Sequence, residues 1–212
     1  MSKQATLDGF FKRQTSNVAA AAYDTVRMKS ETTVMTCASG LVCTTEVIDT
    51  QTERELLAWI DDEKREWTPA PGGRVVLQFG YSYLYETKTV GVAPPIPDLL
   101  DRLMDSLVER KLLGRKPNQI LINKYEPGQG ISAHTDAKCF GDEISSLSLQ
   151  SATTMLFGGS FTHRLLPRSL VVMSGNARWR ITHAIPARKR DPEGPRGRRI
   201  SLTFRFVPPA SS

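Results

Sequence analysis

The chain has 212 residues, of which 40% are hydrophobic and 24% charged, and its formal net charge is +6. This length accommodates one sizeable domain and a tail, and the longest apolar runs, such as Leu170 to Met173, are too short to cross a bilayer. The polar stretch from Met1 to Gly9 shows no signal-peptide core, and the three cysteines form no CxxC pair, which favours a reducing compartment. The modest basic excess suits a polyanionic partner but does not identify one.

The first 30 residues are predicted to form a disordered tail. From Lys12 to Ser30 the chain is rich in Ala, Ser, Thr and charged residues and shows no sustained apolar period. We expect the globular part to begin between Val34 and Val42, and residues 31–212 to fold as one domain.

Two helices are expected next. The pattern Thr52-x-x-Glu55 is typical of a capping box and predicts the start of a helix that Pro69 to Gly73 terminates. Its apolar side would carry Leu56, Leu57 and Ile60. A second helix follows the Pro-rich connector that ends at Pro97, and we expect Gly114 and Pro117 to end it.

The rest of the pattern favours β-structure. Apolar and aromatic residues dominate from Arg74 to Tyr85, where three tyrosines follow period two: Tyr81, Tyr83 and Tyr85. From Ile120 to Val207, short apolar runs alternate with Gly, Pro and Asn turns, as in an antiparallel β-sandwich or barrel. The predicted fold class is therefore α+β, with an N-terminal extension over residues 31–118 and a β core over residues 119–212.

The positions of the histidines, of which there are three, suggest a metal site. Residues i and i+2 of a strand share a face, so His134-Thr135-Asp136 would present an imidazole beside a carboxylate. His183 on a later segment is the candidate third ligand, whereas we interpret His163 as a solvated or internally satisfied side chain. Two histidines and one carboxylate can hold Fe(II) and leave positions for a bidentate co-substrate and O2. An H-x-D pair also arises by chance at a protein surface.

The C-terminal segment from Arg199 to Arg205 alternates polar and apolar residues. One face would carry Arg199, Ser201, Thr203 and Arg205. Guanidinium groups bind carboxylates through paired hydrogen bonds, so this face predicts a carboxylate pocket, although an exposed polar strand face would show the same pattern. Asn123 and Tyr125 share a face by the same rule, and their side chains could reach the same acid.

In order and spacing these motifs resemble the AlkB family of Fe(II)- and 2-oxoglutarate-dependent nucleic-acid dioxygenases, over roughly Phe79 to Val207. The motifs are Asn123-x-Tyr125-x-Pro127-Gly128, His134-x-Asp136, His183 and Arg199 with Arg205. The resemblance implies a double-stranded β-helix, or jelly-roll, core with N-terminal helices and a substrate lid within residues 31–118. The segments from Phe79 to Tyr85 and from Ile144 to Leu149 look closest to the branch that contains the eukaryotic tRNA wobble-uridine hydroxylase.

The resemblance also implies the cofactors and the residues that hold them. Fe(II), 2-oxoglutarate and O2 would be used, with His134, Asp136 and His183 as catalytic iron ligands. The cofactor-binding set would be Asn123, Tyr125, Arg199, Ser201, Thr203 and Arg205. The family reaction implies oxidative demethylation of alkylated DNA bases, with release of formaldehyde, succinate and CO2.

Substrate selection is the point at which this chain departs from the family. A base within a duplex cannot reach such a site, so it must be flipped out or single-stranded, and Tyr81, Tyr83 and Tyr85 are candidates to stack on it or to pack into the core. DNA-repair members carry an acidic residue two positions beyond the H-x-D aspartate, where this chain has Lys138. A lysine can neither accept a hydrogen bond nor favour a cationic methylated base. Asp142 or Glu143 could take the place of the missing acid only if the loop folds back.

The tail contains a possible partner motif. Its elements are Gln4, Leu7, Phe10 and Phe11. This pattern resembles a PCNA-interacting peptide, which would recruit the enzyme to the sliding clamp and place it in the nucleus, with the cytoplasm as a further possibility. The other interpretation is an incidental hydrophobic tag.

Three functions remain open from the sequence. The first is a monomeric DNA-repair dioxygenase without membrane association, recruited by the clamp. The second is an RNA- or tRNA-modifying hydroxylase or demethylase, which Lys138 and the branch resemblance favour. The third is a degenerate dioxygenase fold acting as a binding module, against which the complete set of predicted ligands argues.

Overall fold

The computed structural model describes residues 34–37 and 39–209, and two facing β-sheets form the centre of this part of the chain. The larger sheet has the strand order β1-β2-β12-β9-β16-β7-β4-β3. These strands are β1 (Val34–Cys37), β2 (Leu41–Thr44), β12 (Leu170–Met173), β9 (Ile144–Gln150), β16 (Arg199–Arg205), β7 (Gln119–Tyr125), β4 (Val75–Phe79) and β3 (Thr68–Pro69).

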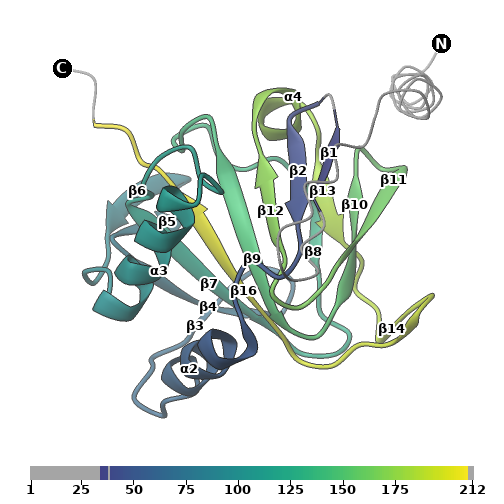
Figure 1. The fold of residues 1–212 in the computed structure, drawn as a ribbon, viewed down its shortest axis with the longest axis horizontal. Coiled ribbons are helices and arrows are strands. Elements are labelled where there is room, and N and C mark those ends of the chain that lie inside the picture. Colours follow the sequence, from purple (N-terminus) through teal and green to yellow (C-terminus); the bar gives the residue numbers. More distant parts are fainter. Residues whose placement is uncertain (1–33, 38, 210–212) are drawn as a thin grey trace.

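The smaller sheet has the order β11-β10-β13-β8. Its strands are β11 (Phe161–Leu165), β10 (Thr153–Phe157), β13 (His183–Ile185) and β8 (Ile131–His134). Two hairpins flank the sheets: β5 (Tyr81–Leu84) with β6 (Thr89–Val92), and β14 (Arg190–Asp191) with β15 (Gly194–Pro195). The predicted jelly-roll core is confirmed (Figure 1).

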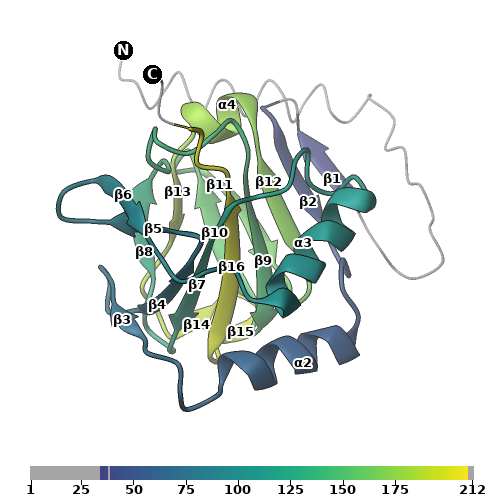
Figure 2. The same cartoon turned by 90° about the vertical axis from the view of Figure 1, so that its left-hand side faces the viewer.

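Two helices cover the larger sheet on the side away from the smaller sheet (Figures 1 and 2). They are α2 (Thr50–Ile60) and α3 (Asp98–Glu109). Their buried side chains, Leu56, Ile60, Leu100, Leu103, Met104 and Leu107, join those of the sheet in one apolar cluster. A second cluster fills the space between the two sheets. The molecule therefore has three layers, and a short helix, α4 (Gly175–Trp179), lies between β12 and β13 in the chain.

Both predicted helices exist, but one end of each differs from the expectation. Asp49, not Thr52, caps α2: its carboxylate accepts a hydrogen bond from the Thr52 amide at 2.7 Å. The expected capping box was wrong because Asp49 is an equally good cap three residues earlier. Helix α3 ends at Glu109, before Gly114, because Lys111 adopts a left-handed backbone with φ of 57°.

Strand β16 shows how the alternating pattern builds the interior. It lies between β7 and β9, and all seven of its residues are buried. Ile200, Leu202 and Phe204 pack toward the helices. The polar residues therefore face the smaller sheet, and the alternative of an exposed polar face is wrong.

The N-terminal part of the described chain contributes strands to the larger sheet. Strand β2 pairs with β12, and β4 pairs with β7, so residues before the expected division at 118 and 119 supply four strands of the larger sheet. The expected lid function of residues 31–118 stays a prediction. Among the described residues, no helix combines the length and the hydrophobicity that a membrane span requires.

Candidate active site between the two sheets

A pocket of about 540 Å³ opens between the sheets. The larger sheet contributes polar residues of β7 and β16, and the smaller sheet contributes the ends of β8 and β13. Most of the residues that the sequence marks as functional line this one pocket: Tyr83, Tyr85, Asn123, Tyr125, His134, Asp136, His183, Arg199, Ser201, Thr203 and Arg205.

The pairing of β8 with β13 brings the two histidines together. His134 and His183 are direct cross-strand partners, and their ring centroids lie 4.4 Å apart. Asp136 follows β8, and its Oδ2 lies 3.5 Å from Nε2 of His183. One ligand atom from each of the three side chains lies within 4.8 Å of the other two, close enough to share one metal ion.

The environment keeps the imidazoles in the form that a metal needs. Nδ1 of His134 lies 2.8 Å from the Ser132 carbonyl, which can only accept, so Nδ1 carries the hydrogen and Nε2 keeps its lone pair. Burial lowers the pKa of His183 to about 4, against the opposing effect of Asp136. The Ser132 contact thus leaves Nε2 of His134 as the nitrogen available to a metal, and burial favours the neutral form of His183 that a metal needs.

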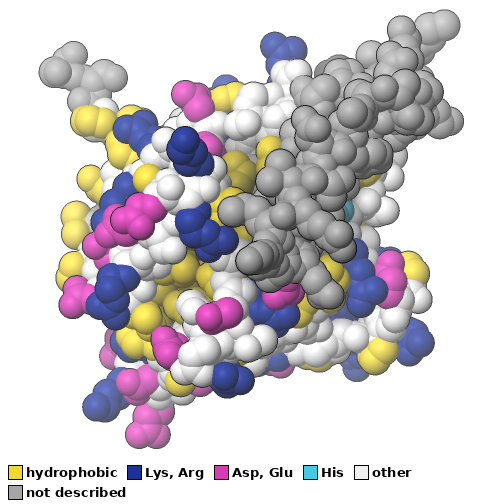
Figure 3. Space-filling view, in the orientation of Figure 1, with side chains coloured by type: hydrophobic (Ala, Val, Ile, Leu, Met, Phe, Trp, Pro, Cys, Tyr) yellow, Lys and Arg dark blue, Asp and Glu magenta, His cyan; other side chains and the backbone are white. Residues whose placement is uncertain are grey.

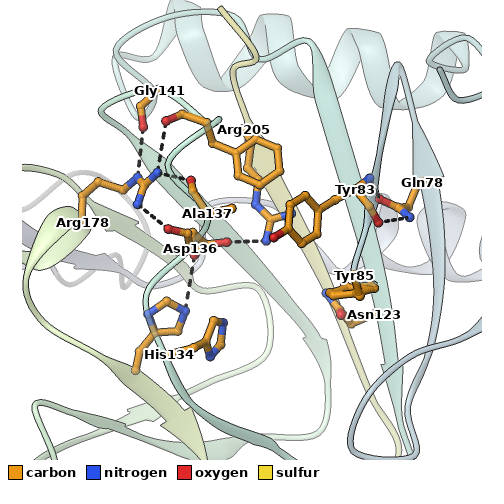
Figure 4. A network of polar contacts seen from close by, with 12 residues as sticks. Gln78, Tyr83, Tyr85, Asn123, His134, Asp136, Ala137, Gly141, Arg178 and Arg205 are labelled. Carbon is orange, nitrogen blue, oxygen red and sulfur yellow. Dashed lines mark hydrogen bonds and ion pairs between the residues drawn. The ribbon is translucent and has the colours of Figure 1, made fainter. Parts of the chain in front are cut away.

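Asp136 stays ionised although it is buried. Burial alone would raise the pKa of its carboxyl, but Arg205 and the two histidines outweigh burial and hold that pKa below its ordinary value. Nη2 of Arg205 donates to Oδ1 of Asp136, and the guanidinium also lies 4.5 Å from the centre of the Phe140 ring (Figure 4). Arg205 thus orients the carboxylate by occupying one of its oxygens.

Arg178 of α4 organises the loop that carries Asp136. Its guanidinium is buried and donates to the backbone carbonyls of Asp136, Ala137, Phe140 and Gly141 at 2.7 to 3.1 Å (Figure 4). Arg178 is not among the residues predicted from the sequence, because nothing in the local pattern of α4 indicates contact with a loop some forty residues earlier.

The glycine at position 130 allows the close approach of β8 and β13. A side chain there would collide with the backbone carbonyl of Ile185 on β13. The turn that ends at Gly130 therefore fixes how His134 meets His183.

The other end of the pocket offers donors for a carboxylate. Arg199 faces Tyr125 across the strand pair and lies 5.5 Å from its ring centre. Nη2 of Arg199 donates to the Ser148 hydroxyl at 2.9 Å, whereas its buried Nε has no hydrogen-bond partner among the described residues. Burial raises the pKa of the Tyr125 phenol despite the nearby arginines, so its hydroxyl remains a donor. An unpaired buried guanidinium nitrogen fits a site for an anionic ligand.

A second arginine that the sequence analysis missed lies beside Asn123. Arg74 precedes β4 and is buried, and its Nε donates to Oδ1 of Asn123 at 2.9 Å. The register of β4 against β7 brings it there, and register cannot be read from the sequence of one strand.

The pocket wall separates the four proposed substrate residues into two groups. Tyr83 and Tyr85 line the pocket, whereas Tyr81 and Lys138 are exposed and do not line it. The side chain of Gln78 holds Tyr83 in place: its Oε1 accepts from the Tyr83 amide at 2.6 Å, and its Nε2 donates to the Tyr83 carbonyl at 3.3 Å (Figure 4).

The pocket contains neither of the two acids that could have compensated for the lysine at position 138. Of the described residues that line the pocket, Asp136 is the only acid, and neither Asp142 nor Glu143 lies there. Glu143 instead accepts a hydrogen bond from the Gly114 amide at 3.0 Å.

Among the described residues, the face of the molecule in view in Figure 3 has no patch of a single charge sign that would indicate a binding partner. On the face in view in Figure 3, lysine and arginine side chains are interspersed with aspartate and glutamate. The tail residues Gln4, Leu7, Phe10 and Phe11 lie outside the described residues, so the clamp-binding motif stays a prediction.

Comparison with known proteins agrees with this geometry. The 2OG-Fe(II) oxygenase superfamily matches residues 7–205. The mouse tRNA (carboxymethyluridine(34)-5-O)-methyltransferase ALKBH8 is 40% identical over 170 residues, covering 72% of this chain but 25% of its own length. This chain thus spans about a quarter of that relative. The Alkylated DNA repair protein ALKBH8 homolog of Arabidopsis thaliana is 28% identical over 233 residues, covering 87% of this chain and 66% of its own length.

Among solved structures, OsALKBH1 shares the fold with a TM-score of 0.66 and 16% sequence identity, over 82% of this chain and 99% of that one. The two imidazoles and the ionised carboxylate form a donor set that suits Fe(II). The chain therefore belongs to the 2OG-Fe(II) oxygenase superfamily, as an AlkB-like dioxygenase that uses Fe(II), 2-oxoglutarate and O2.

Proposed function

We propose that His134, Asp136 and His183 hold the iron, and that Asn123, Tyr125 and Arg199 hold 2-oxoglutarate. The observation that carries this proposal is the convergence of the three ligand atoms at one end of a pocket whose other end has the unpaired guanidinium nitrogen of Arg199. With iron and 2-oxoglutarate bound, O2 would be the oxidant for a C–H bond of the substrate, and conversion of 2-oxoglutarate to succinate and CO2 would supply the other two electrons that O2 takes up.

The protein's own residues divide the remaining tasks. Arg205 keeps Asp136 ionised and oriented, and the Ser132 carbonyl fixes the tautomer of His134. Ser201 and Thr203 place hydroxyls on the pocket wall between the two ends. Tyr83 and Tyr85 form the side against which a flipped or unpaired base would stack.

We infer that the substrate is a neutral base in RNA. The lining cations are Arg74, Lys88, Arg199 and Arg205, against the single acid Asp136, and the charges of Fe(II) and the 2-oxoglutarate dianion cancel. A cationic base such as 1-methyladenine or 3-methylcytosine would therefore enter a positive pocket, which costs free energy that a neutral base does not pay. The 40% identical relative named for a tRNA uridine supports the same substrate class.

The test compares substrates directly. The purified protein is incubated with Fe(II), 2-oxoglutarate and air, with tRNA on one side and with methylated single- and double-stranded DNA on the other, and the bases are then analysed by mass. We expect an oxidised or demethylated base from RNA. Turnover of cationic DNA lesions without any RNA product would overturn the substrate inference.

A matched pair of histidine variants tests the iron assignment. His134→Ala should abolish turnover. His163 lies on β11 and is not part of the metal cluster, so His163→Ala should retain turnover. Equal activity of the two variants would refute the assignment.

Clamp-recruited repair of alkylated DNA is the second candidate, and the pattern of Gln4, Leu7, Phe10 and Phe11 is the observation that favours it. We propose that this tail binds PCNA in the nucleus. Replacement of Phe10 and Phe11 by Ala should remove binding to PCNA and leave turnover of short oligonucleotides unchanged. Unchanged PCNA affinity of this variant would refute the motif.

A further inference from the structure

We propose that Arg74 is a positioning residue for 2-oxoglutarate: it fixes the side-chain amide of Asn123 so that the amide nitrogen faces the ligand. This inference rests on the proposed placement of 2-oxoglutarate beside Asn123.

Arg74 is a buried guanidinium that no carboxylate neutralises in the part of the chain that the structure describes. Its side chain is 3% exposed, and its hydrogen-bond acceptors there are all neutral: the Pro71 carbonyl, Oδ1 of Asn123 at 2.9 Å and the Tyr85 hydroxyl at 3.4 Å. Burying a charge among neutral groups is costly, so an arginine at such a place calls for a specific role. Arg74 also lines the pocket that contains Asn123 and Arg199.

The contact with Asn123 determines which way the amide points. An asparagine side chain can place either its oxygen or its nitrogen at a given position, and a flip exchanges the two. A guanidinium only donates hydrogen bonds, so the atom that meets Nε of Arg74 must be Oδ1. Nδ2 of Asn123, on the other side of the amide, is thereby directed away from Arg74.

Arg74 acts through Asn123 rather than on the ligand itself. Three of its five N–H donors, one from each nitrogen, already donate to protein groups: Asn123 on β7, the Pro71 carbonyl in the turn between β3 and β4, and the Tyr85 hydroxyl just after β5. Without this contact the Asn123 amide could turn its oxygen toward the ligand carboxylate, which would replace a donor by a repulsive acceptor.

Arg74→Met tests the proposal by direct binding. Isothermal titration of the Mn(II)-loaded protein with 2-oxoglutarate should show a dissociation constant raised about tenfold, as expected for the loss of one hydrogen bond to a charged group. Mn(II) affinity in the absence of 2-oxoglutarate should stay within about twofold of the wild type, because Arg74 touches no metal ligand. Arg110→Met is the matched control: Arg110 also donates to a backbone carbonyl, that of Val47, but lies away from this pocket.

A double variant distinguishes positioning from a general structural role. If Arg74 acts through Asn123, Arg74→Met with Asn123→Ala should bind 2-oxoglutarate no more weakly than Asn123→Ala alone. Additive losses would overturn the proposal. Asn123→Asp gives a second readout, since the aspartate would form an ion pair with Arg74 but offers no N–H: 2-oxoglutarate affinity should fall while resistance to urea does not.

Failure of this inference can be separated from failure of the proposed function. If Asn123→Ala leaves 2-oxoglutarate affinity unchanged, the ligand does not lie beside Asn123 and the proposed placement is wrong. If Asn123→Ala weakens binding but Arg74→Met does not, Arg74 has no positioning role. Should Arg74→Met fail to fold, Arg74→Lys, which keeps the charge but replaces three separate donor nitrogens by one, must show the same selective loss in smaller measure or the proposal falls.

Discussion

Two lysines near the site differ in whether they line the pocket. Both side chains are exposed, but Lys88, in the turn between β5 and β6, lines the pocket and Lys138 does not. We therefore expect Lys88→Glu to improve turnover of a cationic base relative to a neutral one about fivefold, because the local field changes by two charges. Lys138→Glu should change this ratio by less than about twofold, because Lys138 does not line the pocket and more solvent screens its charge from a bound base.

The measurement is a competition between a cationic methylated oligonucleotide and its neutral counterpart, at low and high salt. The effect of Lys88→Glu should shrink as salt rises. A larger change from Lys138→Glu than from Lys88→Glu would show that the loop after Asp136, and not the β5–β6 turn, sets the substrate charge.

Arg178 yields a second prediction at this scale. Arg178→Met removes the donor that gathers four loop carbonyls around the Asp136 segment. We expect metal affinity to fall about 10- to 100-fold, the usual effect of losing a group that orients a metal ligand. Titration with Mn(II) measures this loss, and Arg180→Met, an exposed arginine two residues later, serves as the control. Wild-type affinity in Arg178→Met would show that the loop holds Asp136 without help.

The residues that the sequence predicts differ from those it does not in how far along the chain their decisive contacts lie. His134, Asp136 and His183 stand out because their types and spacing carry chemistry, and the structure brings them together. Arg74 and Arg178 act through contacts 49 and about 40 residues away along the chain, respectively. Such contacts follow from sheet register and loop packing, which a single sequence does not specify.

At the scale of elements, the sequence predicts the faces of a strand better than the ends of a helix. The alternation of Arg199 to Arg205 predicts both faces of β16, because a strand buried on both sides sorts its side chains by polarity. Helix α2 begins three residues earlier than predicted, since two competing caps lie within one turn. Strands before residue 80 pair with strands after residue 118, and no local sequence pattern predicts this pairing.

The β14–β15 hairpin depends on one carboxylate. Asp191 accepts from Nε of Arg188 and Nε of Arg196, and from the Thr154 amide of β10 at 3.0 Å. Burial opposes its ionisation, but these three donors outweigh burial and hold the pKa of Asp191 well below its usual range. Asp191→Asn should therefore lower the free energy of unfolding at pH 7 by about 3 kcal/mol.

The sign of the pH dependence follows from the lowered pKa. The unfolded chain binds the proton more readily than the folded one, so the stabilisation is present above about pH 4 and is lost as pH falls further. Urea unfolding at pH 7 and pH 3 should show the gap between wild type and Asp191→Asn narrowing in acid. Asp61→Asn, which breaks an exposed pair with Arg198, should cost about 1 kcal/mol or less. A gap that is constant with pH would contradict the assignment to Asp191.

At the scale of the molecule, the site joins two sheets that otherwise meet through apolar packing. The smaller sheet supplies His134 and His183, and the larger sheet supplies Arg199, Asn123 and Tyr125. A metal ion and 2-oxoglutarate bound together would therefore link the layers, and ligands that bind only the folded state stabilise it. With both Mn(II) and 2-oxoglutarate at about 100 times their dissociation constants, we expect the melting temperature to rise by about 10–20 °C.

The two-sheet arrangement makes this rise depend on residues from both layers. His134→Ala on β8 and Arg199→Met on β16 should each remove most of the rise that 2-oxoglutarate adds to Mn(II), because 2-oxoglutarate needs the metal at one end and the guanidinium at the other. His163→Ala, on β11 of the smaller sheet and outside the metal cluster, should retain the full rise. Differential scanning calorimetry with each ligand alone and with both measures the effect. If His134→Ala kept the 2-oxoglutarate-dependent rise, the co-substrate would bind without the metal, and the two sheets would not be joined through a common site.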